Sequence, residues 1–268
     1  MINFSKRYEE DMIIRMAHHS SAIEGNSITL SDTITILTEG KTVEGYEIRE
    51  FFEIYNHKEA FIELMYKLNN NETLSNSLMK DIHEKLTDNI LVYPGRFKEN
   101  DNYIKGSDVK TVDPRLAEMT MHQWCENLNF QLEIAGDKRG KVKQILKSHV
   151  EFERYHPFED GNGRTGRMLM IYSLMQNDIA PLVIQKEDKN IYKNFLESLS
   201  PYNKEYNENL EKFTDYAMEK IEQEQKRMDD IDKSEKQYVS LDDLIKKEEE
   251  KRKLAINKRR VRRFEFDR

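Results

Sequence analysis

The stretch from His156 to Arg167 constrains this chain more than any other. It reads His-Pro-Phe-Glu-Asp-Gly-Asn-Gly-Arg-Thr-Gly-Arg, which combines a base, two carboxylates, three glycines and two arginines. Closely spaced glycines let the backbone turn sharply, so successive N–H groups can converge on an anion. The mostly apolar run 168–175 that follows predicts a buried helix whose N-terminus faces this loop. Such a helix N-terminus favours phosphate binding.

The residue types in this stretch predict phosphate transfer. Arg164 and Arg167 are three positions apart, so on a helix they share a face and can both bind phosphate oxygens. Asp160 is a hard oxygen ligand of the kind that holds Mg²⁺ on phosphates. His156 can accept a proton near neutral pH from an attacking hydroxyl group.

Two other interpretations of this stretch are weaker. Asp-Gly-Asn-Gly alone is a common turn, but the full string is far less expected by chance. Gly161 and Gly166 have the glycine spacing of a P-loop. However, Arg167 and Met168 stand where a P-loop needs Lys and Ser or Thr, and a His-Pro-Phe corner precedes the loop instead of a strand. We therefore reject a P-loop.

The same residues resemble the signature of the Fic family, His-Pro-Phe-x-[Asp/Glu]-Gly-Asn-Gly-Arg-x-x-Arg, with no position departing from it. Neighbouring features extend the similarity from about residue 15 to about residue 200. The resemblance implies an all-α fold, a Fic-type helical bundle with a β-hairpin flap. It also implies a protein adenylyltransferase (AMPylator) that transfers AMP from MgATP to a Tyr, Thr or Ser hydroxyl of a target protein.

The resemblance further implies a role for each site residue. His156 is then the catalytic base, Asp160 holds Mg²⁺, and Arg167 holds the γ-phosphate. Tyr192 stands where some relatives carry an aromatic near the adenine, although Lys193 replaces a second aromatic there. The nucleotide-binding set implied in this way comprises Tyr103, Ile104, Lys105, Gly106, Asp160, Gly161, Asn162, Gly163, Arg164, Thr165, Gly166, Arg167 and Tyr192.

An N-terminal amphipathic helix ends at Gly25 with a carboxylate in an unfavourable position. Glu24 opposes the helix dipole at that end, which suggests a cationic partner. Ser20-x-x-x-Glu24-Gly25 is similar to the [Ser/Thr]-x-x-x-Glu-[Gly/Asn] motif of Fic proteins that carry their own inhibitory helix. The resemblance therefore implies autoinhibition by Ser20 and Glu24, with Glu24 paired to Arg167. The adjacent His18 and His19 face different sides of a helix, so we expect no metal there.

The middle of the chain predicts helices separated by one β-like segment. Apolar stripes predict helices over about 46–68, from Ser75 through Leu86, from Asp113-Pro114 onward, and from about Lys141 to Tyr155. His149 is expected on the core side of the last of these, whereas His57 and His83 are expected at the surface or its boundary. Alternation within 93–113 predicts a β-hairpin. In Fic proteins a hairpin here is the flap that covers the nucleotide and aligns the target by strand-like pairing.

We expect three parts along the chain: an N-terminal region with the inhibitory helix (1–45), a catalytic core with its flap at about 93–113 (46–200), and a charged helical C-terminal extension (201–268). The segment 206–221 keeps an apolar helical stripe and should still dock on the core. Beyond Lys226 charge dominates, with a potential cap at 240–243 and a basic cluster at 258–263. A solvated helix or tail is the simplest interpretation of that end.

Composition narrows the class of protein. With 268 residues, 37% hydrophobic and 35% charged, the chain can bury one core and a helical appendage. The net charge of −7 argues against general nucleic-acid binding. The only cysteine, Cys125, excludes an internal disulfide, and the charged N-terminus resembles no signal peptide. We expect a cytoplasmic protein with no membrane partner, whose partners are ATP and an unknown target protein, with self-modification and a homodimer left open.

Three alternatives to AMP transfer remain at this point. Another nucleotide or phosphate donor is one, although the kinase-like branch of the Fic family substitutes in the Gly-Asn-Gly-Arg positions and this chain does not. The reverse reaction, hydrolytic removal of AMP with Glu24 positioning water, is a second. A non-catalytic, toxin-like regulator whose basic tail binds nucleic acid is a third, and the intact base and Mg²⁺ ligand argue against it.

Overall fold

The computed structural model describes residues 5–237 of the chain, and the all-α fold expected from the sequence is confirmed. The helical elements are α1 (Lys6–Glu24), α2 (Leu30–Ile34), the π-helical turn η1 (Thr35–Glu39), α3 (Ile48–Asn69), α4 (Asn76–Thr87), the short turn η2 (Pro114–Leu116), α5 (Ala117–Ile134), α6 (Lys138–Tyr155), α7 (Asn162–Gln176), the short turn η3 (Lys186–Asp188), α8 (Lys189–Ser198) and α9 (Tyr206–Gln237).

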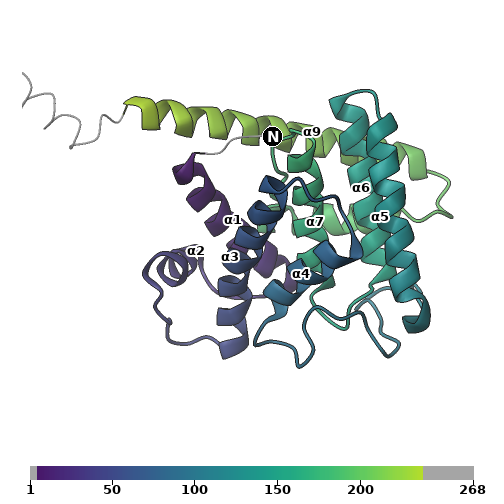
Figure 1. Cartoon of the computed structure of the whole chain (residues 1–268), viewed down its shortest axis with the longest axis horizontal. Helices are drawn as coiled ribbons and strands as arrows, with labels where there is room; N and C mark the ends of the chain where they lie inside the picture. Colours follow the sequence, from purple (N-terminus) through teal and green to yellow (C-terminus); the bar gives the residue numbers. More distant parts are fainter. Residues whose placement is uncertain (1–4, 238–268) are drawn as a thin grey trace, which may run out of the picture. The chain divides into compact units, whose positions relative to one another are not determined.

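Helix α7 lies at the centre of the fold (Figure 1). All of its residues from Arg164 to Met175 are buried, as the apolar run in this part of the sequence predicts. Helices α1, α3, α4 and α6 all pack against it. Because these neighbours hold α7 from several sides, its N-terminus and the loop before it have a fixed position.

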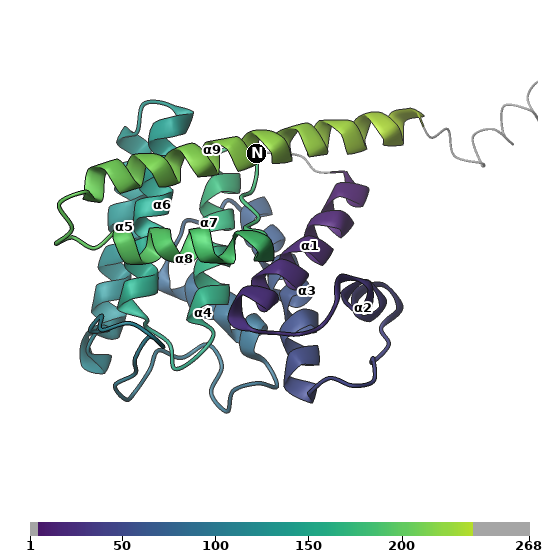
Figure 2. The same cartoon turned by 180° about the vertical axis from the view of Figure 1, so that it is seen from behind.

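The helices around α7 also pack on one another. Helix α5 packs on α6, and α3 packs on α4 (Figure 1). Helix α1 packs on α3, and a cluster of buried residues fills that contact and the adjoining α2 region: Ala17, Ile28, Ile36, Leu37 and Ile54. The view from behind shows α8 on the side opposite α4 (Figure 2). Burial of these apolar faces, at roughly 25 cal/mol per Å², is the main stabilising contribution.

Helix α1 ends abruptly at a glycine. Gly25 has φ +113°, and its N–H donates to the carbonyl oxygen of Ala22. The N–H of Asn26 donates to the carbonyl oxygen of Ser21, which completes a Schellman-type end. The predicted helix end is confirmed, and this geometry presents Glu24 at the tip of the helix.

The segment expected to form a β-hairpin, 93–113, forms no strand ladder. Within the described residues, the one strand-like pairing is an isolated bridge between Phe97 and Phe158. At the other end of the segment, the Val112 N–H donates to the carbonyl oxygen of Tyr155 at 2.9 Å. The backbone at both ends of the excursion therefore binds the backbone around His156, while the ends contact each other through side chains, with Lys98 Nζ donating to Thr111 Oγ1 at 2.9 Å. The regular hairpin of the prediction is corrected to an irregular loop.

The chain divides after Lys226 into two compact units, 1–226 and 227–268. The 206–226 part of α9 belongs to the first unit, where Phe213 stacks on Phe195 at 4.6 Å and the Tyr216 hydroxyl donates to Asp188. The second unit is described only to residue 237, the last described residue of α9. The cap expected at 240–243 and the basic cluster at 258–263 lie outside the described residues.

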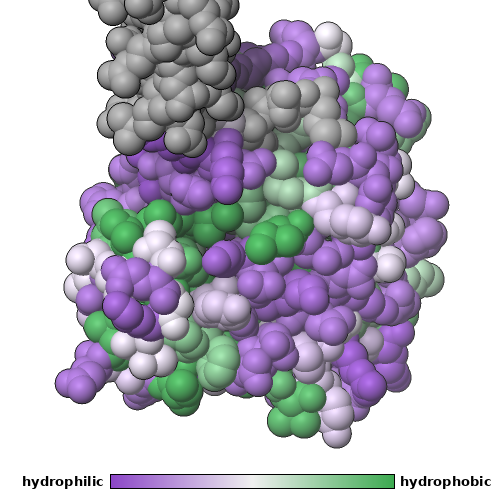
Figure 3. Space-filling view, turned by 60° about the vertical axis from the view of Figure 1, so that its left-hand side comes forward, coloured by the Kyte–Doolittle hydropathy of each residue, from purple (hydrophilic) through white to green (hydrophobic). Residues whose placement is uncertain are grey.

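The surface agrees with the polar composition. Hydrophilic residues cover most of the face in Figure 3, with smaller hydrophobic groups between them. None of the helices described is both long and apolar enough to span a bilayer. Cys125 is buried in α5 and forms no disulfide within the described residues.

Candidate active site

One large cavity, of about 1140 Å³, contains most of the residues that the sequence singled out. Its walls come from the end of α1, the start of α3, the 103–109 loop, the end of α6, the start of α7 and α8. The predicted site residues that line it are Glu24, Tyr103, Ile104, Lys105, Gly106, His156, Asp160, Gly161, Asn162, Gly163, Arg164, Arg167 and Tyr192. Ser20 is buried beside the cavity, and Thr165 and Gly166 lie in the interior, away from its walls.

His156 occupies the turn directly after α6. Its backbone is left-handed, with φ +49° and ψ +59°, and its N–H still closes the helix on the carbonyl oxygen of Phe152. Its ring Nδ1 lies 3.3 Å from the carbonyl oxygen of Glu153. A carbonyl oxygen only accepts, so Nδ1 carries the proton and Nε2 keeps its lone pair. Burial lowers the pKa of His156, which favours this neutral, basic form at neutral pH.

The loop between α6 and α7 is held by side chains from within and from α4. The Asn162 side chain accepts a hydrogen bond from the Phe158 N–H at 2.8 Å and donates to the Phe158 carbonyl oxygen at 2.9 Å. His83 stacks on the Phe158 ring at 3.7 Å, and its Nε2 lies 3.0 Å from the Asp160 carbonyl oxygen. The Gly95 N–H donates to Nδ1 of the same ring, so Nε2 carries the proton and donates to Asp160.

The N-terminus of α7 opens onto the cavity. Gly161 caps the helix with φ +77°, a conformation that glycine adopts without strain. The first hydrogen bond within the helix runs from the Thr165 N–H to the Gly161 carbonyl oxygen. The N–H groups of residues 162–164 therefore have no partner within the helix, and together with the helix dipole they can bind an anion.

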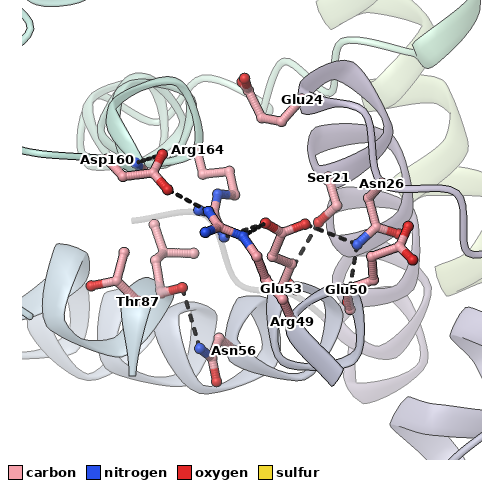
Figure 4. Close-up of polar contacts among 12 residues, drawn as sticks. Ser21, Glu24, Asn26, Arg49, Glu50, Glu53, Asn56, Thr87, Asp160 and Arg164 are labelled. Carbon is pink, nitrogen blue, oxygen red and sulfur yellow. Dashed lines mark hydrogen bonds and ion pairs between the residues drawn. The ribbon is translucent and has the colours of Figure 1, made fainter. Parts of the chain in front are cut away.

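Asp160 provides an oxygen ligand at the edge of the cavity. Its Oδ1 accepts the Gly161 N–H at 2.6 Å, and its Oδ2 forms an ion pair with Arg49 of α3 (Figure 4). Burial opposes ionisation, but the Arg49 guanidinium and the Gly161 N–H lower the pKa of Asp160, so it is a carboxylate at neutral pH. Among the described residues no cluster of three or more metal ligands exists. A single carboxylate facing a phosphate site nevertheless suits Mg²⁺, which keeps several waters and phosphate oxygens as ligands.

Arg167 is bound by the end of the N-terminal helix. Its Nε donates to the Ser20 hydroxyl at 3.0 Å, and its Nη2 donates to the Ser20 carbonyl oxygen at 2.9 Å and to Glu24 Oε1 at 2.7 Å. Burial disfavours the charged form of Glu24, but Arg167 and Arg164 outweigh it and lower the pKa of Glu24. A Cβ atom at Gly163 would lie 2.2 Å from Glu24 Oε1, so a larger residue at position 163 would displace the Glu24 carboxylate from this position.

Arg164 and Tyr192 are more enclosed than the sequence alone indicates. Arg164 is 2% exposed, and its Nη1 lies 3.8 Å from Glu53 Oε1. The Tyr192 hydroxyl lies 2.7 Å from Nε2 of His149, which is buried as expected. Tyr192 therefore lines the cavity while its hydroxyl group is already bound to His149.

Several residues at the site were not recognised from the sequence. His83 and His57 were expected at or near the surface, but both are buried, with relative exposures of 0% and 1%. Burial lowers the pKa of His83 to about 4 and that of His57 to about 3, so both rings are neutral. The prediction was wrong because each lies on the inner side of its helix, where backbone carbonyl groups accept its proton. Arg49 and Glu53 of α3, which contact the predicted residues directly, carry no local sequence signal.

A family model described as Fic/DOC family matches residues 73–174, which include the whole stretch from His156 to Arg167. Among curated proteins, Protein adenylyltransferase Fic of Aedes aegypti is 30% identical over 196 residues. That alignment covers 72% of this chain and 38% of the relative. Protein adenylyltransferase Fic of Culex quinquefasciatus is 29% identical, again covering 72% of this chain and 38% of the relative. The chain thus spans less than half the length of these curated relatives.

Solved structures show the same fold. A Fic domain containing signaling protein from Bacteroides thetaiotaomicron superposes with a TM-score of 0.71 at 22% identity, covering 81% of this chain and 85% of that one. A fragment of Fic-1 from C. elegans superposes with a TM-score of 0.71 at 23% identity, covering 85% of this chain and 66% of that one. At these identities the similarity establishes the architecture.

Proposed function

We propose that this chain, which carries a Fic/DOC family domain at residues 73–174, is a protein adenylyltransferase that transfers AMP from ATP to a hydroxyl group of a target protein. The curated relatives named protein adenylyltransferase support this activity. The observation that carries the proposal is the meeting of a neutral histidine, a helix N-terminus and a carboxylate in one cavity.

In this reaction His156 takes the proton of the attacking hydroxyl group through its unprotonated Nε2. The hydroxyl oxygen forms a bond to the α-phosphorus, and the bond from that phosphorus to the bridging oxygen breaks, releasing pyrophosphate. The N–H groups at the start of α7 stabilise the charge that develops on the phosphate oxygens. Arg167 and Arg164 orient the triphosphate by binding its oxygens.

Asp160 would hold Mg²⁺ on the nucleotide, where the ion neutralises phosphate charge. The carboxylate is ionised and lies beside the anion-binding end of α7, as this role requires. The wall formed by Tyr103, Ile104, Lys105 and Gly106 would cover the nucleotide and align the target, and Tyr192 would contact the base.

We further propose that Ser20 and Glu24 inhibit this activity from within the chain. Both bind the guanidinium group of Arg167, which then cannot bind a phosphate in the same place. We also propose that the reaction takes place in the cytoplasm and that the chain itself is among its targets.

The test compares ATP labelled in the α-phosphate with ATP labelled in the γ-phosphate, using the Glu24→Gly protein with Mg²⁺ and candidate targets. AMP transfer predicts that label enters protein only from the α-labelled nucleotide. Label entering from γ-labelled ATP indicates phosphate transfer and contradicts the proposal. The Glu24→Gly/His156→Ala double mutant is the control for label attached without catalysis.

A further inference from the structure

Arg49 of α3 forms an ion pair with the outer oxygen of Asp160. Its Nη2 pairs with Asp160 Oδ2, and its Nε lies 3.2 Å from Glu53 Oε1, so the guanidinium group lies between two carboxylates (Figure 4). The other oxygen of Asp160 accepts the Gly161 N–H. A cation that approaches Oδ2 must therefore compete with Arg49 for this oxygen.

Arg49 also lies at an electrostatically unfavourable position in its helix. It is the second residue of α3, where the helix dipole disfavours a positive charge. Glu53 and Asp160 compensate for this unfavourable position. The side chains of Arg49 and Asp160 are 49% and 44% exposed, so the pair is open to exchange with a competing ion.

We propose that Arg49 is a positioning residue that guards the metal ligand: it neutralises Asp160 in the resting state and competes with Mg²⁺ for that carboxylate. This inference rests on the proposed function, because it takes Asp160 as the Mg²⁺ ligand. Arg49 acts through Asp160 and has no role in the transfer of the proton or of AMP.

Glu53 connects this guard to the N-terminal helix. Its side chain is buried, and its Oε2 accepts a hydrogen bond from the Asn26 side chain at 3.0 Å. Asn26 directly follows Gly25, the residue that ends α1. The end of α1 thus contacts Arg167 through Glu24. Through Asn26 and Glu53 it also holds Arg49, the arginine that pairs with Asp160 (Figure 4). The end of α1 then opposes both phosphate binding at Arg167 and metal binding at Asp160.

The experiment measures ATP binding by calorimetry over a series of Mg²⁺ concentrations, on a His156→Ala background so that nucleotide is not consumed. Arg49→Gln removes the charge and keeps much of the side-chain volume. Arg139→Gln is the matched control, because Arg139 is also the second residue of its helix, is 41% exposed and pairs with two carboxylates, Glu211 and Asp215. Thermal unfolding of each variant checks that it is folded.

Arg49→Gln should lower the Mg²⁺ concentration at half-maximal ATP binding by about two- to five-fold, a range that corresponds to the usual strength of exposed ion pairs. ATP affinity at saturating Mg²⁺ and the Arg139→Gln profile should match the parent. Glu53→Gln should shift the midpoint in the same direction, because the tether is lost. An unchanged Mg²⁺ midpoint in Arg49→Gln overturns the proposed competition between Arg49 and Mg²⁺. Weaker ATP binding at every Mg²⁺ concentration also overturns it and makes Arg49 a phosphate ligand instead.

Asp160→Asn separates this inference from the proposed function. If ATP binding to Asp160→Asn keeps the Mg²⁺ dependence of the parent, Asp160 is not the metal ligand and that part of the proposed function fails. If Asp160→Asn loses the dependence while Arg49→Gln behaves like Arg139→Gln, only the guard fails.

Discussion

Glu24 Oε1 lies 2.7 Å from Arg167 Nη2, although 143 positions separate the two residues in the chain. The guanidinium group is almost fully enclosed, with 6% of the Arg167 side chain exposed, whereas 42% of the Glu24 side chain faces the cavity. An arginine this enclosed depends on its partners, because an uncompensated buried charge is costly. The pair therefore ties the end of α1 to the first turns of α7.

Glu24→Gly should raise AMP transfer, because Arg167 becomes available to the triphosphate. Partly exposed ion pairs with a buried partner are worth about 1–3 kcal/mol, which corresponds to roughly 5- to 150-fold in rate. The measurement is incorporation of α-labelled ATP into protein at fixed Mg²⁺. Glu24→Gly combined with Arg167→Ala should lose most of the gain.

Glu10→Gly is the control for this change, because Glu10 is an exposed residue of the same helix. The Glu10→Gly change lowers helix propensity without contacting Arg167, so the variant should transfer AMP at the wild-type rate. If the wild-type protein is active and Glu24→Gly does not increase the rate of AMP transfer, then α1 does not restrain the reaction.

His156→Ala should abolish transfer while ATP binding survives. Loss of a general base costs on the order of 10²–10⁴ in rate and leaves the phosphate contacts at α7 intact. In the Glu24→Gly background, the rate should rise with pH as His156 loses its proton, and its lowered pKa places that rise below the usual range of histidine. Single-turnover rates over a pH series, together with calorimetry for ATP, provide the measurement. Transfer by His156→Ala at the parent rate would remove the residue from the mechanism.

The helices and the core of the site could be predicted because their signals are local. The cap at Ser75, the apolar run after Arg167 and the glycine at position 25 each determine structure within a few residues. The glycine-rich stretch likewise contains its own base, carboxylate and arginines. Family resemblance then supplied roles that spacing alone could not.

The flap and the histidines could not be predicted because their partners are distant in sequence. Val112 binds the backbone of Tyr155, so the backbone at this end of the 93–113 segment pairs with the residues around His156 and forms no hairpin ladder. His83 is buried because Phe158 and Asp160 meet it across the fold. Periodicity within one helix does not reveal which polar residue will find such a partner.

His83→Ala should destabilise the fold and loosen the motif loop. The substitution removes a fully buried ring stacked on Phe158 and leaves the Asp160 carbonyl oxygen without its donor. Losses of this kind cost about 2–4 kcal/mol of unfolding free energy. Urea unfolding at neutral pH provides the measurement. His122→Ala removes an exposed histidine and should change the unfolding free energy by less than about 0.5 kcal/mol; equal losses in the two variants would contradict the role of His83.

The buried carboxyl group of Glu153 should make the unfolding free energy depend on pH. Its Oε1 has no hydrogen-bond partner within the described residues, and it lies where a Cβ atom at Gly166 would approach to 2.5 Å. Burial raises the pKa of Glu153 to about 7, an effect that Arg167 opposes and Glu24 reinforces. The neutral rings of His149 and His156 and the bound hydroxyl of Tyr192 add no positive charge nearby.

The raised pKa means that between the unfolded value of 4.5 and about pH 7 the folded protein binds more protons at Glu153 than the unfolded chain does. Unfolding free energy contributed by this group is therefore lost as the pH rises through that window. Glu153→Gln cannot ionise, so it should match the parent near pH 4.5 and become more stable than the parent by up to about 3 kcal/mol at pH 8. Urea unfolding over a pH series measures the difference. Glu133→Gln, at an exposed position of α5, should show a constant difference, and a constant difference for Glu153→Gln as well would mean that the carboxyl group ionises normally in the fold.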